Sequence, residues 1–151
     1  MFEMAEIKAC FPEKIGERAL AVIECFEEIP CNPCSTVCPF KAIRIGADIN
    51  ARPRIDWSLC NGCGICVYSC PGQAIKLVQR KGERCLFKIP HEFLPRPEMG
   101  EVWHAVDRLG KTIGEAVIEN VSASIRQDKT LLVTVAVDAN LLYDFAGIRK
   151  K

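Results

Sequence analysis

Apolar residues recur along the chain in short runs separated by polar turns, a pattern that predicts strands more often than helices. It is clearest in the last third, where the turn-forming sequences DRLGK and RQDK separate three apolar segments. A turn at 80–82 predicts a hairpin further upstream. The final residues, DANLLYDFAGIRKK, predict a short helix that Asp138 would N-cap and that ends in basic residues. The predicted strands are 43–45, 52–57, 75–78, 85–89, 101–106, 112–125 and 130–137.

Ten cysteines add chemistry to this pattern, and most of them lie in two runs. The second run, CNGCGICVYSCPG, has the spacing C-x2-C-x2-C-x3-C-P with which bacterial ferredoxins hold iron–sulfur clusters. The first run, CNPCSTVCPF, matches the last three cysteines and the proline of the second. A shift that places Cys31 on Cys63 also aligns KAIRI with QAIKL beyond the prolines. The two runs are therefore an internal duplication of ligands and scaffold together.

One position breaks the duplication. Glu28 stands where the second run has Cys60, but Cys25 lies just upstream and could supply the missing thiolate through a longer loop. In the bacterial pattern the cysteine before the proline serves the opposite cluster, so the fourth ligands are expected to cross. The predicted cofactors are two [4Fe–4S] clusters. Cluster 1 is assigned to Cys25, Cys31, Cys34 and Cys70, and cluster 2 to Cys60, Cys63, Cys66 and Cys38.

Other interpretations of these cysteines are open. A [3Fe–4S] cluster at the first site, without Cys25, is one, because the loop there is irregular. Structural zinc would leave cysteines of the two runs unused, and disulfides would need an oxidising compartment. Glu28 is expected to be a solvated acid, and Cys10 and Cys85 to be small apolar side chains rather than ligands. The glycines at 62, 64 and 72 are expected to let backbone N–H groups approach the sulfurs.

Composition narrows the function classes further. The formal net charge of +1 argues against a polybasic protein that binds nucleic acid. Apolar runs are too short for a membrane span, and the start MFEMAEIKAC lacks the pattern of a secretory peptide, so a cytoplasmic protein is expected. The chain has no G-x-G-x-x-G fingerprint and no Ser/His/Asp grouping, which favours a non-catalytic role.

The expected fold class is α+β, a bacterial dicluster ferredoxin-like module followed by a small β-rich C-terminal module. A short helical turn is expected after each Cys-Pro pair. The segment PHEFLPRPEMG predicts an extended linker, because proline cannot continue a helix. Towards the end of the lead-in, the segment PEKIGERALAVIEC that approaches Cys25 fits a helix or a strand. The expected divisions are a lead-in at 1–24, the ferredoxin-like domain at 25–89, the linker at 90–100, and a β-rich docking module with a C-terminal helix at 101–151.

Three segments also resemble a known family. IECFEEIPCNPCSTVCP, CNGCGICVYSCPGQAI and LPRPEMGEVWHAVDRLGKTIGEAVI are similar to the small iron–sulfur subunit of multisubunit flavin-dependent dehydrogenases of amino and imino acids. The nearest group is the proline and hydroxyproline dehydrogenase complexes, and the likeness runs from about Val22 onward. The dicluster motif is specific for iron–sulfur binding, whereas the family resemblance rests on the ECFEEIPCNPC loop and the C-terminal stretch.

The resemblance implies a hetero-oligomer. In that family an FAD-containing subunit oxidises a C–N bond, and iron–sulfur centres, which can include a small [2Fe–2S] subunit, carry single electrons to an external acceptor. This chain would then be an electron-transfer subunit with no bond chemistry of its own. The alternatives are a free-standing dicluster ferredoxin or the iron–sulfur subunit of another oxidoreductase, such as a hydrogenase, a formate dehydrogenase or a 2-oxoacid oxidoreductase.

Overall fold

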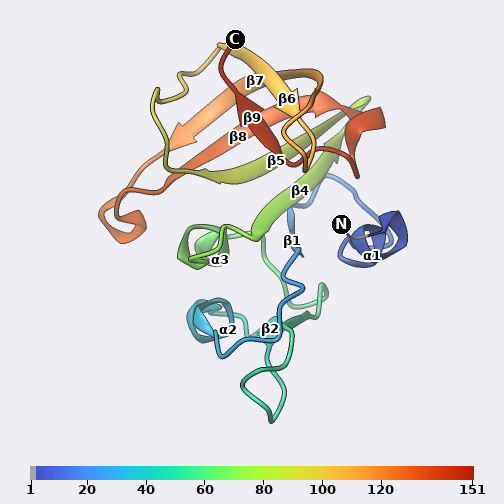
Figure 1. Cartoon of the computed structure of the whole chain (residues 1–151), viewed down its shortest axis with the longest axis vertical. Coiled ribbons are helices and arrows are strands. Elements are labelled where there is room, and N and C mark those ends of the chain that lie inside the picture. The colour runs from blue at the N-terminus through green and yellow to red at the C-terminus, as the bar shows by residue number, and fades with distance from the viewer. Residues whose placement is uncertain (1–2) are drawn as a thin grey trace.

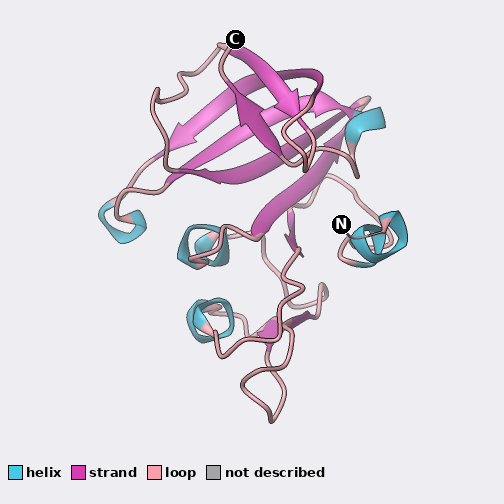
Figure 2. Ribbon diagram, viewed as in Figure 1, coloured by secondary structure: helices cyan, strands magenta, loops and turns pink. Residues whose placement is uncertain are grey.

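The computed structural model describes residues 3–151, which form mostly strands with a few short helices (Figures 1 and 2). Seven strands make one antiparallel sheet in the order β1-β4-β5-β8-β7-β6-β9, and β2 and β3 form a separate two-stranded ribbon. The elements are α1 (Met4–Ala9), β1 (Leu20–Ile23), α2 (Pro33–Val37), β2 (Ile43–Arg44), β3 (Arg54–Ile55), α3 (Ile65–Ser69), β4 (Ile75–Lys81), β5 (Arg84–His91), β6 (Val102–Val106), β7 (Thr112–Ser122), the 3-10 turn η1 (Ile125–Gln127), β8 (Leu131–Asp138), the 3-10 turn η2 (Ala139–Leu141) and β9 (Gly147–Arg149).

The large sheet contains strands from both sides of the proline-rich segment. Strands β5 to β9 gather at one end of the molecule and α2 and β2 at the other, with β4 between them (Figure 1). β5 pairs with β8 along its whole length, from Arg84 opposite Asp138 to His91 opposite Leu131. Pro90 therefore lies inside β5, and the expected linker at 90–100 begins within a strand. The C-terminal strands extend the sheet of the N-terminal half, and the division of the chain into four parts stays a prediction.

The expected C-terminal helix is present only as its capped first turn, and the basic residues expected at its end lie in and after a strand. The Asp138 carboxylate does cap a turn, accepting a hydrogen bond from the Asn140 N–H at 2.8 Å, but that turn is only the single 3-10 turn η2. The chain then buries Phe145 completely, and this ring stacks on Phe87 with centroids 4.6 Å apart. Beyond Phe145 the chain forms β9, which pairs with β6. Burial of one aromatic ring thus outweighs the local helix signal.

The helical turns expected after the Cys-Pro pairs are also misplaced. The helices α2 and α3 precede the prolines, and a tight non-helical turn follows each of them. The segment PEKIGERALAVIEC, which fits a helix or a strand by sequence, contains the strand β1, and the helix α1 lies upstream of it in the lead-in. The first two residues of the lead-in lie outside the described part of the chain. The strands predicted on both sides of the turn at 80–82 form the β4–β5 hairpin.

Two apolar cores occupy the two ends of the molecule. One lies among β4 to β8 and includes Phe87, Trp103, Val135 and Phe145, with Ile7 from α1 packed into it. The other surrounds the cysteines and includes Ile43, Val67 and Leu77. Among residues 3–151, no helix combines the length and the apolar character that crossing a membrane requires.

Candidate metal centre

The sequence duplication is reproduced in the backbone around the cysteines. Helices α2 and α3 occupy equivalent positions in the two runs and pack against each other. After each run, one residue adopts a left-handed conformation, Lys41 at φ 54° and Gln73 at φ 53°. The next amide then turns back onto a thiol: Ala42 N–H donates to Cys38 Sγ and Ala74 N–H to Cys70 Sγ, both at 3.4 Å. A repeat recognised from cysteine spacing is therefore a repeat of hydrogen bonds as well.

Cavity 1 lies where the first run meets the end of the second. Four of its lining residues are cysteines, and apolar side chains such as Ile23 and Ile75 make up much of the remainder. The three upstream cysteines belong to the first run and its leading loop, and the fourth belongs to the second run. The cysteines are Cys25, Cys31, Cys34 and Cys70.

Cavity 2 is its counterpart, and it lies where the second run meets the end of the first. It is also lined by four cysteines, three from the second run and one from the first, with Phe40, Ile43 and Leu77 among the apolar residues. The cysteines are Cys38, Cys60, Cys63 and Cys66. The grouping of thiols by cavity coincides with the two crossed ligand sets predicted from the spacing, and the ligand assignment itself remains a proposal.

The break in the repeat has a structural counterpart. Cys25 lines cavity 1, whereas Glu28 is exposed and is not among the lining residues. Cys10 is half-buried and its thiol donates to the Glu6 carbonyl at 3.4 Å. Cys85 is fully buried in the core of the large sheet. Neither Cys10 nor Cys85 lines either of the two cavities.

Burial makes the innermost thiols reluctant to ionise. It raises the pKa of Cys34 to about 11; a hydrogen bond from the Ser35 backbone opposes the rise, and the neighbouring thiols of cavity 1 add to it. It raises the pKa of Cys66 to about 12, with the other thiols of cavity 2 adding to the effect. Only a thiolate is a metal ligand, so metal uptake at these positions must release protons.

Two glycines shape the second cysteine run. Gly62 has φ +69°, and a Cβ there would come within 2.5 Å of the Ala19 carbonyl oxygen. Gly64 has φ +83° and precedes α3. The glycines therefore permit close chain approach and a left-handed turn, a backbone freedom that other residues rarely have. The amides of Ala42 and Ala74 contact cysteine sulfur, and the sequence interpretation did not single out either residue.

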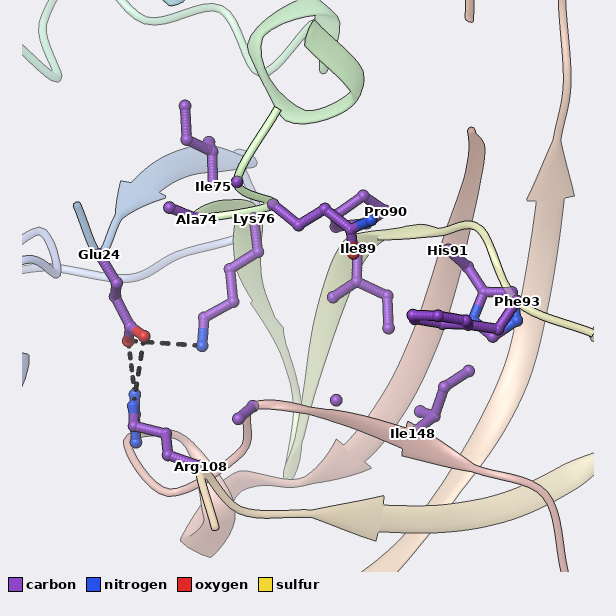
Figure 3. A pocket seen from close by; sticks show the side chains of 14 residues that line it. Glu24, Ala74, Ile75, Lys76, Ile89, Pro90, His91, Phe93, Arg108 and Ile148 are labelled. Atoms are coloured by element: carbon purple, nitrogen blue, oxygen red, sulfur yellow. Dashed lines mark hydrogen bonds and ion pairs between the residues drawn. The ribbon is translucent and has the colours of Figure 1, made fainter. Parts of the chain in front are cut away.

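A charged network next to cavity 1 was also missed from sequence. Glu24, Lys76 and Arg108 meet in a hollow beside β4 and β5 (Figure 3). Burial lowers the pKa of Lys76 to about 8, although the Glu24 carboxylate acts in the opposite direction. His91 lines the same hollow, and its buried Nε2 has no hydrogen-bond partner.

The donor set of the two cavities fits iron–sulfur clusters. Each cavity offers four thiols in a largely apolar lining, the ligand chemistry that [4Fe–4S] clusters require. Among the described residues, no group of three or more His, Cys, Asp or Glu side chains is arranged to hold a single metal ion.

Comparison with known proteins supports iron–sulfur binding by the second run. Residues 53–76 match the model of a 4Fe-4S binding domain. The chain is 41% identical over 51 residues to the ferredoxin-type protein NapF of Haemophilus influenzae. The matched region covers 32% of this chain and 29% of that protein. The chain is 40% identical over 70 residues to NADH-quinone oxidoreductase subunit I of Pelobacter propionicus, covering 40% and 36%. It is 38% identical over 53 residues to pyruvate synthase subunit PorD of Methanothermobacter marburgensis, covering 35% and 58%.

These matches cover one domain of the chain rather than its whole length. The chain spans about a third of the length of the first two relatives. No solved structure matches it significantly. The chain thus contains a ferredoxin-type 4Fe-4S domain, and none of these relatives is named as a dehydrogenase of amino or imino acids.

Proposed function

We propose that this chain is an electron-transfer subunit that binds two [4Fe–4S] clusters. The observation that carries the proposal is the pair of cavities, each lined by four thiols with one contributed by the opposite run. Cavity 1 would hold one cluster and cavity 2 the other. When bound, such a cluster accepts and releases one electron at a time.

The chain's own residues provide the setting for this chemistry. Cys34 in α2 and Cys66 in α3 are both buried, and the two helices pack together, so the two ligand sets are neighbours. Val67 and Ile75 are fully or almost fully buried beside them and exclude water from the sulfurs. Cys63 is exposed, which leaves one edge of cavity 2 open to a redox partner. Hydrogen bonding and solvent exposure are the means by which a protein adjusts cluster potential.

The partner we propose is an FAD-containing subunit that oxidises an amino or imino acid such as proline or hydroxyproline. Its support is the resemblance of the ECFEEIPCNPC loop and the C-terminal stretch to that family. Two of the relatives are named as subunits of other oxidoreductases, which supports membership of a complex and keeps a different oxidoreductase as the second candidate.

Metal and sulfide analysis tests the cofactor proposal. The full chain, purified or reconstituted without oxygen, should contain about eight irons and about eight acid-labile sulfides, because each cubane contains four of each. About half that content would support one cluster and exclude the second. Zinc without sulfide would contradict the proposal altogether.

The partner proposal predicts where substrate oxidation resides. The isolated chain should not reduce an artificial acceptor with proline or hydroxyproline, because it has no dinucleotide-binding fingerprint to hold FAD. The native complex, isolated through this chain, should contain a flavoprotein and oxidise one of these substrates. A native complex that instead oxidises pyruvate or NADH would support the second candidate.

A further inference from the structure

Three charged side chains from distant parts of the chain meet just before Cys25. Glu24 follows β1, Lys76 lies in β4, and Arg108 lies in the turn between β6 and β7 (Figure 3). Arg108 donates through Nε at 3.2 Å and through Nη2 to the two carboxylate oxygens of Glu24. Lys76 Nζ lies 3.6 Å from Oε1 of the same carboxylate. This bidentate geometry specifies orientation as well as attraction.

The two cations are themselves held by main-chain carbonyls. Lys76 Nζ donates to the Phe145 carbonyl at 2.8 Å, and Arg108 Nη1 donates to the Tyr143 carbonyl at 2.5 Å. Both carbonyls lie between η2 and β9. The carboxylate is therefore fixed by two cations that are themselves anchored in the C-terminal third of the chain.

The backbone of Glu24 is fixed as well. Its N–H donates to the Ala74 carbonyl at 2.9 Å, which extends the β1–β4 ladder one residue beyond Ile23 and Ile75. The N–H of Ala74 in turn donates to Cys70 Sγ. Side chain and backbone of Glu24 are thus both anchored at the residue immediately before Cys25.

Cys25 needs such an anchor because the repeat is broken there. Cys34 and Cys66 are held within helices, and Cys60 lies in a loop that Arg18 secures through the Cys60 carbonyl. Cys25 belongs to no helix or strand and stands outside the C-x2-C spacing.

We infer that Glu24, held by Arg108 and Lys76, is a positioning residue that places the Cys25 thiol in cavity 1. The inference rests on the proposed function. It makes the β6–β7 turn a support for one metal centre and not for the other. A guanidinium from the β6–β7 turn thereby compensates for the cysteine that the first run lacks at the position of Glu28.

The test is a double-mutant comparison on the full chain, reconstituted with iron and sulfide. Arg108→Met, Cys25→Ser and the double variant are compared by iron content and by EPR of the reduced and oxidised protein. Arg108→Met should lose between about one and about four of the eight irons, all from the first cluster, through conversion to a three-iron form or outright loss. The double variant should lose no more than Cys25→Ser alone, because both changes act on one ligand.

Controls separate positioning from general stability. Lys150→Met removes an exposed ion pair with Glu101 from the same sheet and should leave the iron content unchanged. Arg108→Lys keeps the charge but loses the bidentate fork, and should restore part of the loss. If Arg108→Met does not fold, Glu24→Gln, which keeps the side-chain shape, takes its place in the same comparison.

Two results would overturn the inference. One is a folded Arg108→Met or Glu24→Gln protein with all its iron and an unchanged spectrum. The other is a double variant that loses more iron than Cys25→Ser alone, because that result assigns Arg108 a role in overall stability. A wild-type chain without iron and sulfide would instead refute the proposed function, so the two failures are distinguishable.

Discussion

Serine at both Cys38 and Cys63 should leave about four irons per chain, whereas serine at both Cys38 and Cys34 should leave almost none. The reason is the crossing of the fourth ligands. Cys38 and Cys63 line the same cavity, so the first pair of changes removes ligands from one cluster only. Cys34 lines the other cavity, so the second pair of changes damages both clusters. Iron and sulfide analysis of the two reconstituted variants measures the difference.

An arrangement without crossing predicts the opposite order. If each run held its own cluster, Cys34 and Cys38 would share a cluster and their joint loss would leave about four irons. Cys10→Ser is a suitable control, because this half-buried thiol lies outside both cavities and its loss should leave the iron content unchanged. The two double variants carry the same number and type of substitutions, so a general effect of lost thiols would not separate them.

The cysteine end of the fold was largely predictable because its signal is local. Ligand spacing within a few residues dictates how the chain wraps, and a duplication of spacing implies a duplication of backbone. The left-handed residues Lys41 and Gln73 follow this rule although neither has a side chain that favours such a conformation. Their equivalence could be predicted from the repeat, but not from residue preference.

The C-terminal half was predictable in its strands and not in their arrangement. Apolar runs between polar turns identify β6, β7 and β8, yet nothing local says that β8 inserts between β5 and β7. The same limit explains why the C-terminal helix stops after a single 3-10 turn. Asp138 is a sound local cap signal, but Phe145 a few residues later gains more from stacking on Phe87 than from continuing a helix.

The Glu24–Arg108 pair could not be predicted for a related reason. The two residues are 84 positions apart, and they meet only because the sheet brings the β6–β7 turn back to the end of β1. A glutamate next to a cysteine and an arginine in a polar turn are each unremarkable in sequence. Ion pairs between residues so far apart in sequence form only after the fold brings them together, so the sequence alone does not predict them.

Truncation after Ile89 should prevent folding of the remaining chain rather than release an independent iron–sulfur module. The cut removes β8, the partner of β5 along its whole length, and with it Val133, Val135 and Val137, which are fully buried. Burial of such a side chain is worth about 1.5–3 kcal/mol. Three of them together therefore approach the total stability of a small domain, about 5–15 kcal/mol. Phe87, also fully buried, would lose its stacking partner as well.

Far-ultraviolet circular dichroism and limited proteolysis of the truncated chain measure this result. A matched control ends the chain after Ala146, which removes β9 from the edge of the sheet but keeps β8 and the Phe145 carbonyl that holds Lys76. This control should remain folded and protease-resistant, because β9 pairs with β6 alone. A truncation after Ile89 that gives a cooperative thermal transition and retains iron would contradict the predicted loss of folding. It would mean that the cysteine core alone stabilises the truncated chain. The shared sheet predicts otherwise: Val78 and Phe87 lie on β4 and β5, but their core is completed by strands that come after position 100.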